Sequence, residues 1–375
     1  MTINELLAEL VRFESVSPPG NEKGCARFVQ DYIDDLRIPD CTTDLHDFSE
    51  GRANLVVRIG PRNPGLLLSG HIDVVPAGDP TLWQSPPFEI RSAGGRLFGR
   101  GVADMKGGVA SMMKAVEAAK HLTFKRQLTL VATAGEEVGF DGLQKLISDG
   151  RIRKEDAMYG VVGEPTGLKV ARAHKGVSQH RITFHGRSAH ASRPDLGVNA
   201  IEQASLFISE LKKVRRRLGS RRHRFLGTTT FEATMISGGT KENIIPEKAE
   251  VVVDCRRIPD FSVDDIRGEI QVALKEVRKQ HASLRAESEV IRAFGPLDVP
   301  EQSPIVLLLE KLTRSKSISV PYATEAPEYG SLGIPTVVFG PGSIQQAHTT
   351  DEYVEEKELL GAVSIYEKLI RRVCA

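Results

Sequence analysis

The chain has 375 residues, of which 40% are hydrophobic and 26% are charged, a composition typical of a soluble globular protein. Its 50 Lys and Arg side chains nearly cancel its 49 Asp and Glu side chains, so the formal net charge is +1. This balance argues against nucleic acid or an anionic membrane as a partner and favours a small-molecule substrate. A chain of this length exceeds what one hydrophobic core usually supports, so two domains are expected.

The cysteines and the N-terminal segment bear on the cellular compartment. Cys25, Cys41, Cys255 and Cys374 are scattered with no Cys-x-x-Cys pair, which favours reduced thiols over disulfides or a cysteine zinc site. The first stretch, MTINELLAELVRFESV, has the apolar spacing of one helix face and lacks the basic and apolar regions of a signal peptide. No apolar run approaches the ~20 residues that a membrane-spanning helix needs. We therefore expect a cytoplasmic protein.

The first half of the chain alternates strand-like and helix-like segments, which predicts an α/β domain with a mixed sheet and helices on both faces. The expected elements are strands over residues 54–59 and 65–75, a helix over 106–119, and strands over 128–133 and 159–162. Pro165 ends the last of these strands and leaves Glu164 at its carboxyl end. Ligands of open α/β sheets gather at that edge.

From residue 178 the pattern becomes that of a small α+β domain with one antiparallel sheet. Its expected elements are strands over 178–184, 228–236 and 249–254, a helix over 198–218, and a helix to about residue 280 that Ser262 and Asp265 open with a capping box. The first pattern resumes after residue 290, with a helix over 303–314, a strand over 336–339 and a helix from residue 355. We therefore expect one domain of residues 1–177 and 290–375, interrupted by an inserted domain of residues 178–289.

A basic stretch at residues 212–224, KKVRRRLGSRRHR, could form an anion-binding patch. It begins at the polar end of a predicted helix and runs into a Gly-Ser turn. We interpret it as a solvated helix face.

Metal-compatible side chains occur in five short stretches. In the first, His71 and Asp73 occupy positions i and i+2 of a predicted strand, so both side chains point to the same face. An imidazole beside a carboxylate is typical of a metal ligand with its orienting group, and also of a buried histidine satisfied by an aspartate. In the second stretch, Asp104 lies among glycines just ahead of a helix, where it could bind a metal or cap the helix.

The third stretch places Glu136 and Glu137 side by side after a buried strand. Adjacent carboxylates repel each other unless cations or a proton separate them, so one metal ligand and one proton carrier would resolve the conflict. Two solvated surface acids are the alternative. The fourth stretch is Glu164 at its strand end, and the fifth is AHTTDE, which carries His348 in a loop rich in Gly and Pro. Together the stretches supply oxygen and imidazole ligands for zinc, cobalt or manganese, and enough of them for two metals and a base.

These stretches resemble a family of dinuclear zinc deacylases and exopeptidases that includes acetylornithine deacetylase, succinyl-diaminopimelate desuccinylase, aminoacylase and glutamate carboxypeptidase. The resemblance runs nearly end to end, through SGHIDVVPAG, GRGVADMKGG, TAGEEVG, GEPT and GPGSIQQAHTTDEY. It implies two divalent metal ions, zinc in the first place with cobalt or manganese as alternatives. One ion would be held by His71, Asp104 and Glu164. The other would be held by Asp104, Glu137 and His348, with Asp104 bridging the two.

The resemblance also implies roles for residues that hold no metal. Glu136 matches the general base, and Asp73 matches the carboxylate that orients the histidine at position 71. The peptide bond after the bridging aspartate is expected to be cis. The inserted domain is similar to the lid and dimerisation domain of the family, so a homodimer is expected.

Within the family, VARAHKG, GRSAHASRPDLGVNAIE and TEAPEYGSLGIPTVVFGPGSIQQAH resemble acetylornithine deacetylases. By that resemblance His190 reaches across the dimer to the substrate carbonyl, and Asn243 and Arg256 contact the carboxylate end of the substrate. Two features depart from this pattern: KENIIP at residues 241–246 looks more like the desuccinylase, and QAHTTDEY lacks the proline usual after the histidine.

We therefore expect metal-dependent hydrolysis of a small-molecule N-acyl amino acid, with acetyl as the acyl group. Glu136 would carry a proton from water to the departing amine, His190 would stabilise the oxyanion, and Arg256 would pair with the substrate carboxylate. The alternatives are a desuccinylase of succinyl-diaminopimelate and an exopeptidase of the same family. A non-catalytic binding protein on the same fold is more distant, because it would be expected to lack a ligand or Glu136.

Overall fold

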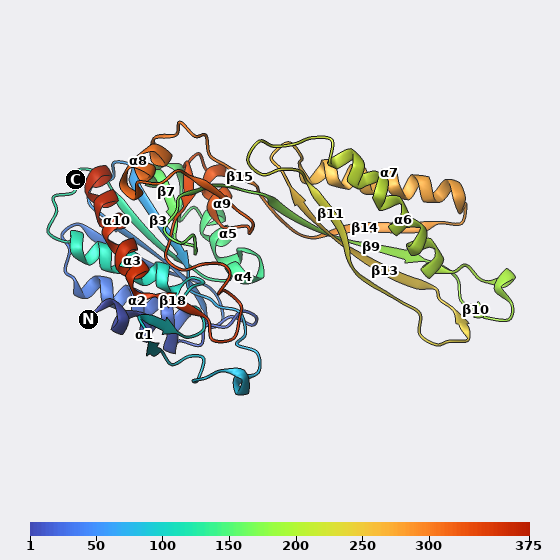
Figure 1. Ribbon diagram of the computed structural model, residues 1–375, viewed down its shortest axis with the longest axis horizontal. Helices are drawn as coiled ribbons and strands as arrows, with labels where there is room; N and C mark the ends of the chain where they lie inside the picture. Colours follow the sequence, from blue (N-terminus) through green and yellow to red (C-terminus); the bar gives the residue numbers. More distant parts are fainter. The chain divides into compact units, whose positions relative to one another are not determined.

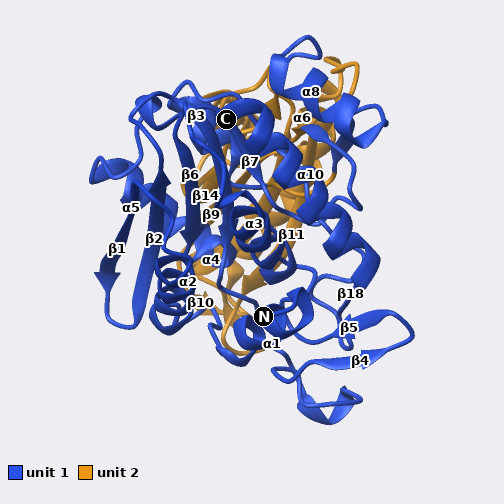
Figure 2. Cartoon of the chain, turned by 90° about the vertical axis from the view of Figure 1, so that its left-hand side faces the viewer, with its two compact units in different colours: residues 1–172, 299–320, 324–375 blue, residues 173–298, 321–323 orange.

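The computed structural model describes residues 1–375, which form two compact units (Figure 1). Unit 1 comprises residues 1–172, 299–320 and 324–375, and unit 2 comprises residues 173–298 and 321–323 (Figure 2). Unit 2 is therefore inserted into the sequence of unit 1. None of the helices combines the length and the apolar character that crossing a membrane requires.

A mixed sheet forms the centre of unit 1, in the order β1-β2-β6-β3-β7-β17-β8. Its strands are β1 (Cys41–Ser49), β2 (Arg52–Ile59), β3 (Gly65–His71), β6 (Leu128–Thr133), β7 (Ala157–Val162), β8 (Ala171–His174) and β17 (Thr336–Val338). Strands β6, β3, β7 and β17 are parallel, whereas β1 and β2 pair antiparallel. Every residue of β3 and β6 is buried, as expected of central strands covered on both faces.

Helices cover both faces of this sheet, as neighbouring residues of β3 demonstrate. A side chain at Gly70 would meet the Met105 side chain at 2.5 Å and Val109 at 2.9 Å, so this face packs on helix α3 (Lys106–Ala119). Ser69 points to the opposite face, where its hydroxyl hydrogen-bonds Tyr329 of helix α9 (Ala326–Ser331) at 2.7 Å. The other main helices of unit 1 are α1 (Ile3–Arg12), α2 (Lys23–Asp35), α5 (Asp141–Ser148), α8 (Pro304–Thr313) and α10 (Glu356–Cys374).

Short elements complete the unit near the sheet's carboxyl edge. Helix α4 (Glu136–Gly139) is a single turn that follows β6. A small antiparallel sheet joins β4 (Arg91–Ala93), β5 (Arg96–Phe98) and β18 (Tyr353–Glu355). The peptide bond between Asp104 and Met105 is cis, as expected.

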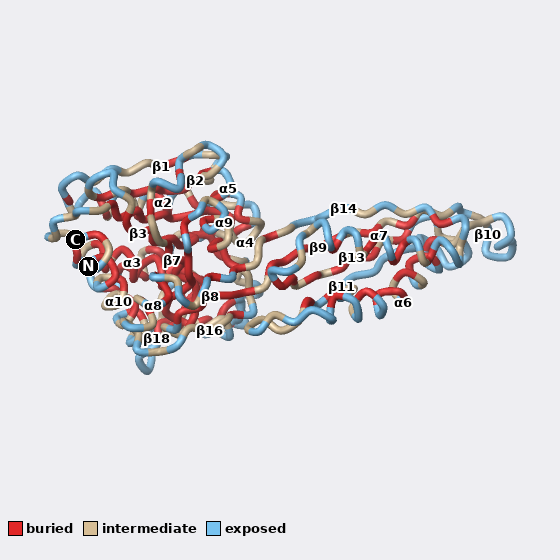
Figure 3. Tube along the Cα trace, turned by 90° about the horizontal axis from the view of Figure 1, so that it is seen from above, coloured by how far each residue is buried: buried red, intermediate tan, exposed pale blue.

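Unit 2 contains a four-stranded antiparallel sheet in the order β11-β13-β9-β14. Its elements are β9 (Gly176–His185), β11 (Thr230–Gly238), β13 (Lys248–Arg257), β14 (Arg285–Phe294), α6 (Ala200–Leu218) and α7 (Val263–Gln280). Alternate residues of β13 are buried (Figure 3). Buried apolar residues of β13, α6 and α7 belong to one hydrophobic core. The predicted capping box is present, because Ser262 and Asp265 each accept the main-chain N–H of the other.

The elements expected from the sequence are present, with two kinds of difference. The predicted strand over residues 65–75 is too long, because β3 ends at His71 and Asp73 lies in the loop beyond it. Several elements were not expected, among them helices α2, α5 and α9 and strands β1 and β8. Strand β1 is an edge strand with a single fully buried residue, so its side chains lack the apolar run that marks the central strands.

Candidate metal centre

The expected metal ligands come from loops at the carboxyl ends of the central parallel strands. His71 is the last residue of β3, Glu164 follows β7, and Glu137 lies in the turn of helix after β6. Asp104 closes the loop that enters α3, and His348 lies in the loop between β17 and β18. Because parallel strands end at one edge of a sheet, the topology brings these segments together.

Two groups of three potential ligands meet at this edge, and Asp104 belongs to both. In the first group, Nε2 of His71 lies 3.1 Å from Oδ1 of Asp104 and 3.7 Å from Oε1 of Glu164. In the second, Nε2 of His348 lies 3.4 Å from Oδ2 of Asp104 and 3.0 Å from Oε1 of Glu137. The two carboxylate oxygens of Asp104 therefore serve different groups, as a bridging ligand requires.

The electrostatics of the cluster fit divalent cations. Burial raises the pKa of Glu164 well above its usual value, and the negative charge of Asp104 raises it further. Hydrogen bonds to Asp104 and Glu137 raise the pKa of His348 to about 10. Without a cation, protons must therefore offset the crowded carboxylates. Carboxylate and imidazole donors with no thiolate suit zinc, cobalt or manganese, so the residues present fit two such ions.

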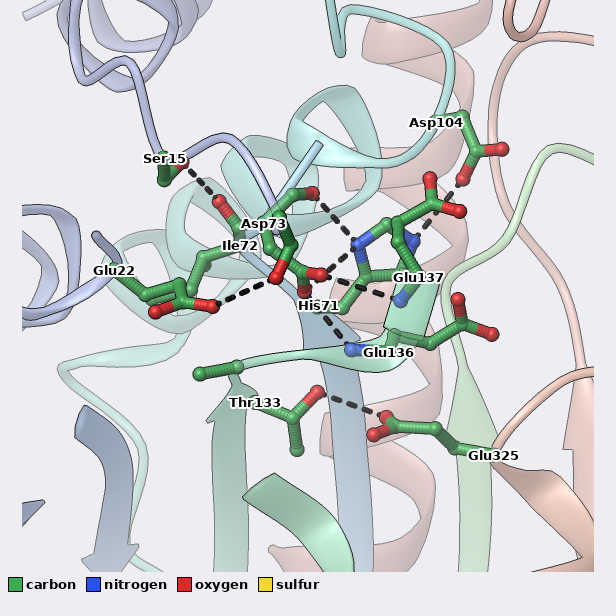
Figure 4. A network of polar contacts seen from close by, with 12 residues as sticks. Ser15, Glu22, His71, Ile72, Asp73, Asp104, Thr133, Glu136, Glu137 and Glu325 are labelled. Carbon is green, nitrogen blue, oxygen red and sulfur yellow. Dashed lines mark hydrogen bonds and ion pairs between the residues drawn. The ribbon is translucent and has the colours of Figure 1, made fainter. Parts of the chain in front are cut away.

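Asp73 connects the first histidine to the turn that carries the adjacent glutamates (Figure 4). Nδ1 of His71 donates to the main-chain oxygen of Asp73 at 2.9 Å and lies 3.6 Å from its carboxylate oxygen Oδ1. This bond leaves Nε2 of His71 free to present its lone pair to a metal. The Asp73 carboxylate accepts the main-chain N–H of Glu136 at 3.1 Å and of Glu137 at 3.2 Å.

Glu136 lies in the same cluster but outside the two groups that share Asp104. One of its carboxylate oxygens falls within 4.8 Å of ligand atoms of His71 and Glu137. Burial of the carboxyl group raises the pKa of Glu136 well above its usual value, although the charge of His71 opposes the shift. A carboxyl group whose pKa is raised holds a proton more readily than an exposed one, as a general base must when it accepts a proton from water.

Two buried glutamates near the site were not expected. Glu325 accepts a hydrogen bond from Thr133 at 2.8 Å, its other oxygen has no partner, and burial raises its pKa to about 8. Glu352 accepts hydrogen bonds from the loop that carries Asp104. In the sequence neither glutamate differs from a surface acid, and only the fold shows that both are buried.

The three residues expected to contact substrate all belong to unit 2. His190 lies in the two-residue strand β10 (Ala189–His190), which pairs with β12 (Ile244–Ile245) directly after Asn243. The main-chain oxygen of Asn243 accepts the N–H of Ala191 at 2.9 Å, so His190 and Asn243 are close neighbours, and both are exposed. Arg256 lies near the far end of β13, where its Nε donates to Asp254 at 2.8 Å.

Comparison with known proteins identifies the family. Residues 67–372 match the sequence profile of peptidase family M20/M25/M40. The chain is 35% identical over 324 residues to an acetylornithine deacetylase of Pectobacterium carotovorum, which covers 86% of this chain and 83% of that protein. It is 31% identical over 324 residues to an acetylornithine deacetylase of Buchnera aphidicola, with 86% and 84% covered.

Solved structures share the fold at lower sequence identity. An M20-family metallo-carboxypeptidase of Sulfolobus solfataricus superposes with a TM-score of 0.80 at 16% identity, covering 99% of both chains. A tripeptidase of Staphylococcus aureus gives a TM-score of 0.76 at 23% identity and 98% coverage of both. A dinuclear metal-binding M20 peptidase of Bacillus subtilis gives 0.71 at 14% identity, covering 98% of this chain and 96% of that one. The profile match, the curated relatives and the shared fold agree: this chain belongs to peptidase family M20/M25/M40.

Proposed function

We propose that this protein removes the acetyl group from an N-acetyl amino acid, in the manner of an acetylornithine deacetylase. Its family and its relatives make it a metal-dependent deacylase that hydrolyses an amide bond. The observation that carries the proposal is the placement of Asp104, whose two oxygens face His71 and His348 separately. That arrangement supports a centre of two ions with one shared carboxylate.

We infer that zinc is the resident metal, with cobalt or manganese as alternatives. His71, Asp104 and Glu164 would hold one ion, and Asp104, Glu137 and His348 would hold the other. When bound, such ions polarise an acyl carbonyl and lower the pKa of a water molecule towards ~7.

Glu136 is the proposed general base. It would accept a proton from the attacking water and deliver it to the departing amine, so that the amine nitrogen does not leave as an anion. Asp73 supports this role by holding the main-chain N–H of Glu136, which limits where the carboxyl group can reach. The same aspartate holds the orientation of His71 through its main-chain oxygen.

His190 is the proposed donor to the oxyanion. The main-chain N–H of Ser192 donates to Nδ1 of His190 at 3.2 Å, so Nδ1 is an acceptor. The proton of the neutral ring therefore sits on Nε2, which can donate to a developing negative charge. Asn243, beside His190, and Arg256 would contact the carboxylate end of the substrate, for which a guanidinium is well suited.

We further propose a homodimer that forms through unit 2, which would act as a lid and dimerisation domain. Exposed apolar side chains on edge strand β11 support such an interface: Met235 is 68% exposed and Ile236 is 56% exposed. His190 would then serve the site of the partner subunit. We place the enzyme in the cytoplasm, where its four free cysteines would stay reduced.

A substrate panel tests the proposed activity. The metal-loaded protein is assayed on N-acetylornithine, other N-acetyl amino acids, N-succinyl-diaminopimelate and short peptides, and we expect the highest kcat/KM on an N-acetyl amino acid. The desuccinylase-like segment KENIIP gives a specific reason to include the succinyl substrate. Faster turnover of the succinyl compound or of a peptide would overturn the acetyl assignment, and no turnover with metal bound would favour a non-catalytic binding protein.

A further inference from the structure

Glu352 is a buried carboxylate on which four donors converge. Its Oε1 accepts the main-chain N–H of Ala103 at 2.8 Å and of Asp104 at 3.1 Å. Its Oε2 accepts the main-chain N–H of Gly101 at 3.0 Å and Nη1 of Arg100 at 2.6 Å. The residue is 1% exposed. Both carboxylate oxygens are thus fully used by one short loop.

The same residue joins two loops that carry candidate ligands. Glu352 lies four positions after His348, and its main-chain oxygen accepts the N–H of Gly99 at 2.9 Å. The four donors to the Glu352 carboxylate belong to residues 100–104, a loop that ends at Asp104. Arg100 is 2% exposed, and its guanidinium lies 5.2 Å from the ring centre of Trp83, a cation–π contact.

We propose that Glu352 is a positioning residue that sets the main chain of Asp104 before any cation binds. Asp104 must place one carboxylate oxygen towards His71 and the other towards His348. A mobile main chain at Asp104 would leave the positions of both oxygens undefined. If the loop is ordered before metal binds, binding loses less conformational entropy. Groups that orient metal ligands typically affect metal affinity by ~10–100-fold. The inference rests on the proposed role of Asp104 as the shared ligand.

A structural anchor with no bearing on the metal would behave differently. Its loss would lower the stability of the metal-free protein, but the folded fraction would bind metal as before. Metal affinity and the visible spectrum of bound cobalt therefore separate the two roles, because the spectrum reports the ligand geometry around the ion.

The test compares Glu352→Gln with Glu355→Gln. The amide of Glu352→Gln has the shape of the carboxylate but turns an NH2 group towards one pair of donors, whichever way it is oriented. Glu355 is a matched control in the same segment, because it forms a half-exposed ion pair with Arg96 at 2.8 Å. Metal-free proteins are titrated with Co²⁺ against a competing chelator while the visible absorption is recorded. We expect Glu352→Gln to bind cobalt ~10–100-fold more weakly with an altered spectrum, and Glu355→Gln to match the wild type.

Circular dichroism of the metal-free variants establishes that they are folded. If Glu352→Gln does not fold, Glu352→Asp takes its place, since it keeps the charge but is too short to reach all four donors, and the same weakening is expected. A folded variant with wild-type cobalt affinity and spectrum overturns the positioning role while leaving the proposed function intact. If the wild type itself takes up no cobalt, the proposed metal centre fails, and the role of Glu352 fails with it.

Discussion

The carboxylate of Asp73 accepts the main-chain N–H of Glu136 at 3.1 Å, so the residue beside the first histidine also holds the proposed base. Asp73 lies in the loop after β3, which ends at His71, and Glu136 is the first residue of α4. One aspartate thereby fixes His71 through its main-chain oxygen and the Glu136 turn through its side chain. The positions of a metal ligand and of the base are consequently coupled.

Asp73→Asn should disturb the turn that carries the base Glu136 and the ligand Glu137, whereas the main-chain oxygen that holds His71 is retained. The amide nitrogen would face either Glu136 N–H or Glu137 N–H, and two donors cannot bond each other. We expect kcat and metal affinity each to fall by ~10–100-fold, measured by steady-state kinetics and chelator competition. Asp47→Asn is the control, since Asp47 pairs with Lys23 on the surface of β1. A variant with wild-type kcat and metal affinity would contradict the coupling.

Glu136→Gln should separate catalysis from metal binding. The substitution removes a proton acceptor but no ligand, so we expect kcat to fall by ~10²-fold or more while metal content stays at the wild-type level. Glu137→Gln is the matched comparison and should lose metal. Element analysis of both purified variants provides the measurement. If Glu136→Gln is the variant stripped of metal, the roles of the two glutamates are exchanged.

Metal binding should release protons and strengthen as pH rises. Hydrogen bonds to Asp104 and Glu137 raise the pKa of His348 to about 10, so its ring is protonated at neutral pH in the metal-free protein. That raised pKa stabilises the metal-free protein fully below ~6.5, the unperturbed value, and the contribution is lost as pH rises through about 10. A cation must displace this proton.

Titration calorimetry at pH 7 in two buffers with different ionisation enthalpies measures the released protons. His348→Ala should release fewer protons than the wild type and should flatten the loss of metal-free stability between neutral pH and pH 10. Binding enthalpies that are independent of the buffer would show that no proton is displaced.

His190 should act in the partner subunit. Mixed dimers of His190→Ala and Glu136→Gln chains contain one site with both an intact base and an intact partner histidine. After subunit exchange we expect activity to return, up to about half the wild-type level per mixed dimer. Subunit exchange demonstrated without any return of activity would assign His190 to its own chain, and so would a monomer with full turnover.

The sequence predicted the candidate metal ligands better than the contacts that hold the loops carrying them. Glu137 and Glu164 follow strand ends that short apolar runs mark, so both could be assigned to strand ends before the structure was known. His71 was expected inside a longer strand, and only the structure shows that β3 ends there. The contacts of Asp73 could not be foreseen, because they depend on where β3 ends. The bonds of Glu352 to the loop of Asp104 join positions 248 or more residues apart, and no local pattern indicates them.

Helix α2, one of the helices that were not expected, was missed for a local reason. Helix α2 does carry a buried face, made by Cys25, Ala26, Val29 and Ile33. These side chains are few and partly small, and polar residues interrupt them, so the helical spacing was weak in the sequence. Packing against β2 supplies the stability that local propensity lacks.

Reconstitution of the metal-free protein tests the central claim most directly. Metal is removed with a chelator, and hydrolysis of N-acetylornithine is followed while Zn²⁺ or Co²⁺ is added back in measured equivalents. Because all five proposed ligands serve only the ions, we predict no turnover in the metal-free protein and full recovery as two equivalents bind. Full turnover by protein that element analysis shows to be free of metal would contradict the account.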